Sequence, residues 1–347
     1  MPAPGSRHQA PHGWIEHPQP HFASIAASTV VSRGAQVFRT FAGRARMIGF
    51  TDLDFRLPGW GLFGPPAARQ ERRPQRKGEP GGPLSAQVSV ESVDGMELRV
   101  ARWRLDQPSE HPPLLFFNGI GANIEAVAPL AEALTERGFI MFDMPGTGES
   151  PDPVLPYNPF TMSLTALSLI ERFGLDRVDV MGMSWGGAMA QHFALQHGRH
   201  VRRVVLAATS PGLMMIPGDP AMLAQMADPY SAINGMLMRE YLTALDNADE
   251  SKLARNSIGN ITPPTPTGYF YQLMALAGWT SLPALPFMDK PVLVMMGEND
   301  PIVPLSNGQL LASAIPGARL EVFEDAGHLF LMTHPKRSVQ MLREFLG

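Results

Sequence analysis

The chain of 347 residues contains no cysteine. This absence excludes disulfide bonds, zinc sites built on thiolates and a thiol nucleophile. No apolar run approaches the roughly 20 residues that cross a bilayer, and residues 1–20 lack the apolar segment of a secretory signal. Positive charge is also scarce, because 32 Asp and Glu outnumber 28 Lys and Arg. We therefore expect a soluble, cytoplasmic protein with no transmembrane segment and no nucleic-acid partner.

The first 83 residues differ from the remainder in charge. They hold 11 Lys and Arg against 5 Asp and Glu, which leaves 17 of the 28 basic and 27 of the 32 acidic residues for the rest. Residues 64–83 are rich in Pro, Gly and Arg, which is typical of a disordered linker. Residues 25–50 mix valine and phenylalanine with arginine, so a basic amphipathic helix on an anionic or apolar surface is the alternative to a poorly ordered extension. We predict that residues 1–83 form an N-terminal extension, largely disordered, with this one candidate helix.

From Leu84 onward the chain has the patterning of a folded domain. Residues 86–90 and 97–103 alternate around the turn signal Asp94-Gly95, which predicts a β-hairpin. Short apolar runs follow, with helical patterns such as 126–137 and 161–173 between most of them. The runs are 113–117, 138–142, 178–181, 204–207, 292–296 and 320–323. This alternation predicts an α/β fold with a mostly parallel sheet and helices on both faces.

One gap interrupts this rhythm, because about 80 residues between Thr209 and Pro291 carry no clear strand signal. They are rich in methionine, proline and aromatic residues. We predict that residues 84–210 and 286–347 form the core and that 211–285 form a helical cap over the sheet. Its methionines and aromatics, with Tyr269, Phe270, Tyr271 and Trp279 among them, either bind apolar chains or simply pack.

The pentapeptide Gly182-Met183-Ser184-Trp185-Gly186 joins a predicted buried strand to a predicted helix over residues 188–195. A serine in such a turn is held in a strained conformation with its hydroxyl above the edge of the sheet. The glycines have a steric role, because side chains there would collide across the turn. This context predicts Ser184 as a nucleophile.

A serine nucleophile needs a base that takes its proton and an acid that orients the base. In this architecture the acid and then a histidine follow the serine along the chain. Asp300 and His328 each come just after a predicted strand, where parallel sheets gather catalytic groups. The nearby alternatives are Glu298, Glu324, Asp325 and His334. Order and position favour Asp300 as the orienting acid and His328 as the base.

The reaction also needs hydrogen-bond donors for the developing oxyanion. We expect the backbone amide of Trp185, at the start of the helix, and that of Ile120, in the loop after the run 113–117, to form this oxyanion hole. A plain glycine-rich turn is the alternative for the Ile120 loop, in which Asn118 stands where many such enzymes have histidine.

A second glycine-rich loop covers residues 143–150. It lacks the fingerprints of phosphate-binding loops, so a structural turn near the site is the better interpretation. No group of side chains has metal-ligand spacing. We therefore predict neither a metal nor a cofactor.

Together these residues resemble the α/β-hydrolase superfamily and, in more detail, the intracellular depolymerases of medium-chain-length poly(3-hydroxyalkanoate). The similarity extends over residues 84–347. It is carried by residues 115–123, 184–188, 206–209, 279–281, 300–301 and 327–331. The resemblance implies an α/β-hydrolase fold with a helical cap insertion, and a substrate that is a hydrophobic polyester of 3-hydroxy acids stored in cytoplasmic granules. The long N-terminal extension departs from the family pattern and leaves docking to the granule surface open.

Other activities fit the same residues. A general carboxylesterase or lactonase, or a 3-hydroxyacyl transferase with a thiol or thioester acceptor, would use the same acyl-enzyme. A non-catalytic granule-binding protein is a further alternative, against which the intact Ser184, Asp300 and His328 argue. Epoxide hydrolases and dehalogenases need a carboxylate at position 184, and polyester synthases of this fold use cysteine there, so both are disfavoured. The oligomeric state is left open.

Overall fold

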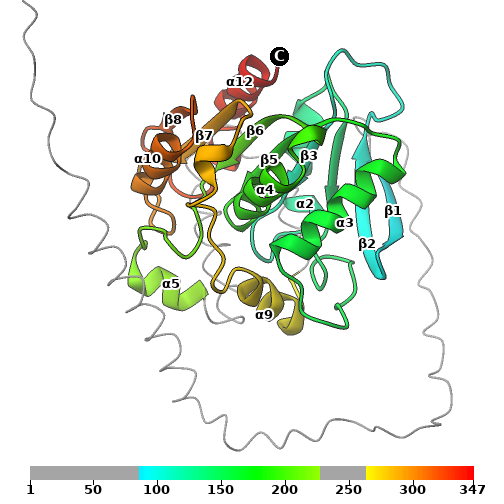
Figure 1. Cartoon of the computed structure of the whole chain (residues 1–347), viewed down its shortest axis with the longest axis horizontal. Helices are drawn as coiled ribbons and strands as arrows, with labels where there is room; N and C mark the ends of the chain where they lie inside the picture. The colour runs from blue at the N-terminus through cyan, green and yellow to red at the C-terminus, as the bar shows by residue number, and fades with distance from the viewer. Residues whose placement is uncertain (1–85, 227–262) are drawn as a thin grey trace, which may run out of the picture. The chain divides into compact units, whose positions relative to one another are not determined.

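The computed structural model describes residues 86–226 and 263–347 (Figure 1). The predicted extension 1–83, with its candidate amphipathic helix, lies outside the described residues. So does the middle of the predicted cap, residues 227–262.

The described residues contain one sheet of eight strands in the order β1-β2-β4-β3-β5-β6-β7-β8. The strands are β1 (Gln87–Val93), β2 (Met96–Trp103), β3 (Leu114–Phe117), β4 (Phe139–Phe142), β5 (Val178–Met183), β6 (Val201–Ala207), β7 (Val292–Gly297) and β8 (Arg319–Phe323). Strand β2 is antiparallel to β1 and β4, and the remaining neighbours are parallel. The predicted α/β fold with a mostly parallel sheet is therefore confirmed.

The predicted hairpin is β1 and β2. Its turn residues Asp94 and Gly95 have φ angles of 49° and 79°. Two successive positive φ values match the right-handed twist of paired strands, and the pair Asp-Gly adopts them at low free-energy cost. This local chemistry fixes the register in which Val93 lies opposite Met96.

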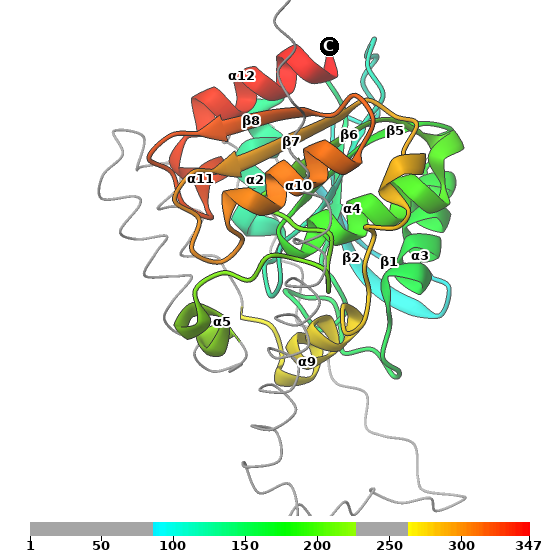
Figure 2. The same ribbon diagram turned by 60° about the vertical axis from the view of Figure 1, so that its left-hand side comes forward.

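Helices cover both faces of the sheet (Figures 1 and 2). The described helices are α2 (Ile124–Ala133), α3 (Pro159–Arg172), α4 (Trp185–Gln196), α5 (Pro220–Met226), α9 (Pro266–Ala275), α10 (Leu305–Ala314), α11 (Phe330–Thr333) and α12 (Pro335–Leu346), with short 3₁₀ turns η1 (Gly198–His200) and η2 (Leu285–Phe287). Buried residues of α3, α4 and α10 share one apolar cluster, and those of α2 and α12 share the other.

Alternation along single strands explains these two clusters. In β3, Phe117 belongs to the cluster under α3 and α4, whereas Phe116 belongs to the cluster under α2 and α12. In β4, Phe142 and Met141 divide in the same way. Successive strand side chains point to opposite faces, so a strand covered on both sides must be apolar at every position. All four residues of β3 are buried, which accounts for the continuous apolar runs in the sequence.

Two described helices, α5 and α9, fall within the predicted cap. Helix α9 begins beside the loop that follows β4, because the Thr265 amide donates to the Gly146 carbonyl oxygen over 2.8 Å. A side chain at Gly146 or at Gly268 would overlap the backbone of the other. Helix α9 is thus held closely against the carboxyl ends of the central strands.

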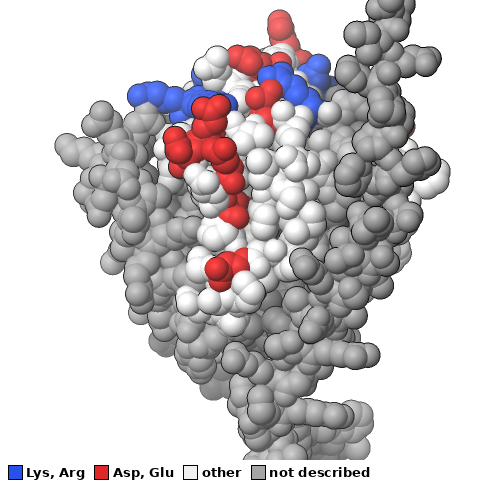
Figure 3. Space-filling model, turned by 90° about the vertical axis from the view of Figure 1, so that its left-hand side faces the viewer, with Lys and Arg blue, Asp and Glu red and all other residues white. Residues whose placement is uncertain are grey.

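The described surface carries both signs of charge. On the face in Figure 3, Asp and Glu side chains form a line over a largely uncharged surface, and Lys and Arg gather near its upper edge together with further Asp and Glu. The face in this view therefore presents a mixed pattern and not a basic stripe.

Candidate active site

Ser184 lies at the sharp turn between β5 and α4. Its backbone has φ 54° and ψ −119°, a conformation that a side chain makes costly. A Cβ at Gly182 would overlap the Gly186 carbonyl, and a Cβ at Gly186 would overlap the Phe117 carbonyl. The predicted collision across the turn is therefore confirmed for Gly182, whereas a side chain at Gly186 would collide with the end of β3 instead. The turn is anchored to β6 by a 2.8 Å hydrogen bond from the Ser184 amide to the Ala207 oxygen.

The structure brings Ser184, His328 and Asp300 into one hydrogen-bonded line. Nε2 of His328 lies 2.9 Å from Oγ of Ser184. Nδ1 of the same imidazole lies 2.7 Å from Oδ2 of Asp300. A ring nitrogen that donates to a carboxylate leaves the other nitrogen free to accept a proton, so this arrangement can deprotonate the serine hydroxyl.

The Asp300 carboxylate is fixed from both of its oxygens. While Oδ2 faces His328, Oδ1 accepts hydrogen bonds of 2.9 Å from the amides of Ile302 and Val303. Asp300 is 5% exposed and His328 is 3% exposed. A buried carboxylate needs such partners, and they hold it in the orientation that the imidazole requires.

The alternative residues for the acid and the base are not part of this hydrogen-bonded line. Glu298, Glu324 and Asp325 are exposed. Glu298 is engaged with the Asp325 amide at 3.3 Å. The His334 ring is 2.8 Å from the Thr333 hydroxyl, at the start of α12.

The loop after β3 is closed by its own asparagine. Oδ1 of Asn118 accepts from the Gly119 amide over 2.9 Å, and Nδ2 donates to the Asn123 carbonyl over 2.8 Å. No acceptor within the described residues takes the Ile120 amide proton. Trp185 is the first residue of α4, so its amide has no acceptor inside the helix. Among the described residues neither amide therefore has a hydrogen-bond acceptor, which is a condition for an oxyanion hole.

Gln272 is a site residue that the sequence did not predict. It is fully buried on α9. Its side-chain Oε1 accepts from the Gly121 amide, and its backbone oxygen accepts from Nε1 of Trp185, both over 2.8 Å. No local motif marks it, since 87 positions separate it from Trp185.

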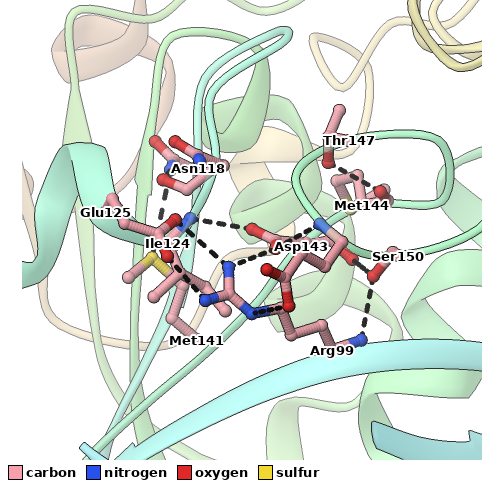
Figure 4. A network of polar contacts seen from close by, with 11 residues as sticks. Arg99, Asn118, Ile124, Glu125, Met141, Asp143, Met144, Thr147 and Ser150 are labelled. Carbon is pink, nitrogen blue, oxygen red and sulfur yellow. Dashed lines mark hydrogen bonds and ion pairs between the residues drawn. The ribbon is translucent and has the colours of Figure 1, made fainter. Parts of the chain in front are cut away.

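A buried ionic network joins the end of β4 to the start of α2 (Figure 4). Asp143, at the end of β4, accepts from the Ile124 amide at the start of α2 over 2.7 Å and from Nη1 of Arg99 over 3.1 Å. Arg99 also pairs with Glu125. Burial raises the pKa of Asp143 to about 6, although Arg99 and the amides of Ile124 and Glu149 favour its charged form. The glycine-rich loop 143–150 therefore serves as scaffolding, which agrees with the structural turn predicted for it.

Within residues 86–226 and 263–347, no helix has the length and apolar character that a membrane span requires. No group of three or more His, Asp or Glu side chains in this part of the chain is arranged to hold a metal ion.

This chain is similar to several known proteins. A model of the alpha/beta hydrolase fold family matches residues 112–335. A poly(3-hydroxyalkanoate) depolymerase from Ectopseudomonas oleovorans is 39% identical over 239 residues, which cover 67% of this chain and 84% of that protein. A 3-oxoadipate enol-lactonase from Acinetobacter baylyi is 24% identical over 66% of this chain and 86% of its own length. An enol-lactonase structure from Burkholderia xenovorans matches with a TM-score of 0.62 at 23% identity, over 74% of this chain and 99% of that chain, and so shares the fold.

Proposed function

Because this chain belongs to the α/β-hydrolase fold family and is a carboxylic-ester hydrolase, we propose that it cleaves the ester bonds of medium-chain-length poly(3-hydroxyalkanoate) with Ser184, His328 and Asp300 as a catalytic triad. The observation that carries the triad is the continuous line from Ser184 Oγ through both ring nitrogens of His328 to Asp300, at 2.9 and 2.7 Å. Geometry of this kind, and not sequence position, defines a triad.

In the first half of the reaction, Ser184 Oγ attacks the ester carbonyl carbon while His328 Nε2 takes the hydroxyl proton. Asp300 keeps the other ring proton on Nδ1 and stabilises the imidazolium that forms. The tetrahedral intermediate then collapses, and His328 returns the proton to the departing alkoxide. The products are a shortened chain with a free hydroxyl and an acyl group on Ser184.

The amides of Ile120 and Trp185 form the oxyanion hole in this proposal. Both are backbone donors held in place before the charge develops, which is the arrangement that lowers the barrier to acyl transfer most. Water then attacks the acyl carbon while His328 takes its proton. The bond from the acyl carbon to Ser184 Oγ breaks, His328 returns the proton to Oγ, and the 3-hydroxy acid is released.

The substrate is the finer part of the proposal. The relative at 39% identity bears the name of a poly(3-hydroxyalkanoate) depolymerase, and the exposed side chains of α9 include Phe270 and Met274. Such side chains suit the alkyl branches of a medium-chain polyester. We place the reaction at the surface of cytoplasmic polyester granules.

The test supplies purified protein with amorphous medium-chain granules, short-chain granules and p-nitrophenyl octanoate, and compares the parent protein with Ser184→Ala. We expect clearing of the medium-chain granules, release of free 3-hydroxy acid, and loss of both activities in the variant. Turnover of the soluble ester without granule clearing would refute the depolymerase and favour a carboxylesterase or lactonase.

Two further readouts separate the remaining alternatives. Addition of a thiol acceptor that diverts the product to a thioester at the expense of the free acid would identify a transferase. Granule binding without turnover of any ester would identify a non-catalytic binding protein. Undiminished turnover by Ser184→Ala would refute the mechanism as a whole.

A further inference from the structure

Gln272 contacts both sides of the proposed oxyanion hole from a helix that belongs to neither. Its backbone oxygen accepts from Nε1 of Trp185, whose amide is one proposed donor, over 2.8 Å. Its side-chain Oε1 accepts from the amide of Gly121, the neighbour of Ile120, also over 2.8 Å. A single residue of α9 therefore joins the loop after β3 to the start of α4.

The contact with Gly121 bears directly on the Ile120 amide. That amide belongs to the peptide between Gly119 and Ile120, and the peptides on both sides of it are hydrogen-bonded. The Gly119 amide is held by Oδ1 of Asn118, and the Gly121 amide is held by Gln272. Because peptide units are planar, fixing both neighbours limits how far the Ile120 N–H can rotate. Gly121 itself has φ 68°, a conformation open to glycine. The Gly119 carbonyl, which belongs to the same peptide as the Ile120 N–H, accepts from the Ala122 amide over 3.2 Å, so Gln272 adds to a hold that the loop provides for itself.

When the Gln272 side chain accepts from the Gly121 amide, its own amide nitrogen is left unpaired among the described residues. A backbone N–H can only donate, so the atom facing Gly121 must be the amide oxygen, and this fixes the orientation of the glutamine side chain. Among the described residues, its Nε2 is then buried without a hydrogen-bond partner. An unpaired buried donor destabilises a fold.

We propose that Gln272 is a positioning residue that makes the oxyanion hole depend on the seating of α9, an inference that rests on the proposed function. Helix α9 is itself held by two hydrogen bonds. The Thr265 amide donates to the Gly146 carbonyl, and the Tyr269 hydroxyl donates to the Met226 carbonyl at the end of α5. Docking of the helix aims the Ile120 amide and fixes the Trp185 side chain. Its displacement loosens the loop after β3 while leaving Ser184, His328 and Asp300 in place. Gln272 thus acts on the transition state more than on the bound substrate.

The test compares Gln272→Met with Gln191→Met. Methionine keeps the length of the side chain and the backbone oxygen that holds Trp185, but it provides no good acceptor for the Gly121 amide. Gln191 is the matched control: it is equally buried, and its amide bonds to Gly187, Ser210 and Ser281 and not to the loop after β3. Inhibition of p-nitrophenyl octanoate hydrolysis is measured with n-octylboronic acid, which forms a tetrahedral adduct on serine, and with N-methyloctanamide, which resembles the substrate.

In Gln272→Met we expect binding of the boronic acid to weaken about tenfold or more and kcat to fall by a similar factor, since one oxyanion donor is misaimed. Amide binding and KM should change by less than about twofold, because the interaction lost is one made in the transition state. In Gln191→Met we expect a lower Tm and an unchanged ratio of boronic acid to amide affinity. Gln272→Asn keeps a buried amide on an arm one methylene shorter, so it should show the same loss and serves if the methionine variant does not fold.

An unchanged ratio in both Gln272 variants would overturn the inference while leaving the triad intact. An equal loss in Gln191→Met would overturn it too, because the effect would then be one of general stability. If the unmodified protein binds the boronic acid no better than the amide, the proposed function itself fails and the inference fails with it.

Discussion

Nε2 of His328 and Oγ of Ser184 lie 2.9 Å apart, although 144 positions separate the two residues in the chain. The order of the strands in the sheet brings these two residues together. Ser184 follows β5, His328 follows β8, and Asp300 follows β7 between them in sequence. Strands β5 to β8 are parallel neighbours, so their carboxyl ends lie along one edge and the three loops converge there.

Replacing Asp300 by asparagine should lower kcat by roughly 10³- to 10⁴-fold with little change in folding. An asparagine amide that faces Nδ1 favours the tautomer with the proton on Nε2, which cannot accept from Ser184. The matched control is Glu298→Gln, an exposed carboxylate at the end of the same strand, which should leave kcat within about twofold.

Hydrolysis of p-nitrophenyl octanoate measures both variants, with Tm as a check on folding. Comparable losses in the two variants would remove Asp300 from the triad. So would retention of more than about a tenth of the activity in Asp300→Asn, given the expected loss.

The backbone strain at Ser184 predicts that one substitution changes activity and stability in opposite directions. Glycine adopts φ 54° and ψ −119° more readily than serine, so Ser184→Gly should abolish turnover and yet raise the free energy of unfolding. A single strained residue costs about 1–3 kcal/mol, and the greater freedom of glycine in the unfolded chain offsets part of this. We expect a net gain of about 1 kcal/mol in urea unfolding. Ser184→Ala, which keeps its Cβ and the strain, should be inactive without that gain, and equal stability of the two variants would contradict the prediction.

Gly186 is predicted to tolerate no side chain. A Cβ there would overlap the backbone of Phe117 and Asn118, so Gly186→Ala must push the start of α4 away from the loop after β3. We expect a loss of about 1–3 kcal/mol in unfolding free energy and at least about a tenfold fall in kcat, because small displacements of catalytic groups reduce rates strongly. Gly198→Ala is the control, since its Cβ would meet only ordinary contacts. Equal behaviour of the two variants in urea unfolding and ester turnover would show that the turn can relax.

The sequence predicted the α/β fold because each central strand is apolar on both faces. It predicted the strand-to-helix turn, in which local sterics dictate glycine at Gly182. It also named three side chains that the structure brings together, whose roles in catalysis stay predictions. The predicted run at 204–207 begins three residues after the start of β6 at Val201. Arg202 and Arg203 interrupt its apolar pattern, although Arg202 pairs with buried Asp179.

Contacts that join distant segments left no local pattern in the sequence. Gln272 is one glutamine in a helix, and only the packing of α9 gives it partners 87 and 151 positions away. The Arg99–Asp143 pair likewise spans 44 positions. In both, the signal lies in the tertiary arrangement and not in spacing along the chain, so sequence reasoning about periodicity had no access to it.

The Asp143 carboxyl should make stability depend on pH in a defined direction. Its pKa is raised by burial from 3.8 to about 6. A carboxyl whose pKa is higher in the folded state binds a proton there first, so its contribution to stability is fully present below about pH 3.8 and is lost as the pH rises through about 6.

In Asp143→Asn this contribution is absent at every pH. The unfolding free energy of the unmodified protein, relative to the variant, should therefore increase by about 1 kcal/mol between pH 7 and pH 5. Urea titrations of both proteins at pH 7, 6 and 5 measure the difference. Parallel stability curves would mean that Asp143 stays charged, and a relative decrease toward pH 5 would mean that the pairing with Arg99 outweighs burial and lowers its pKa.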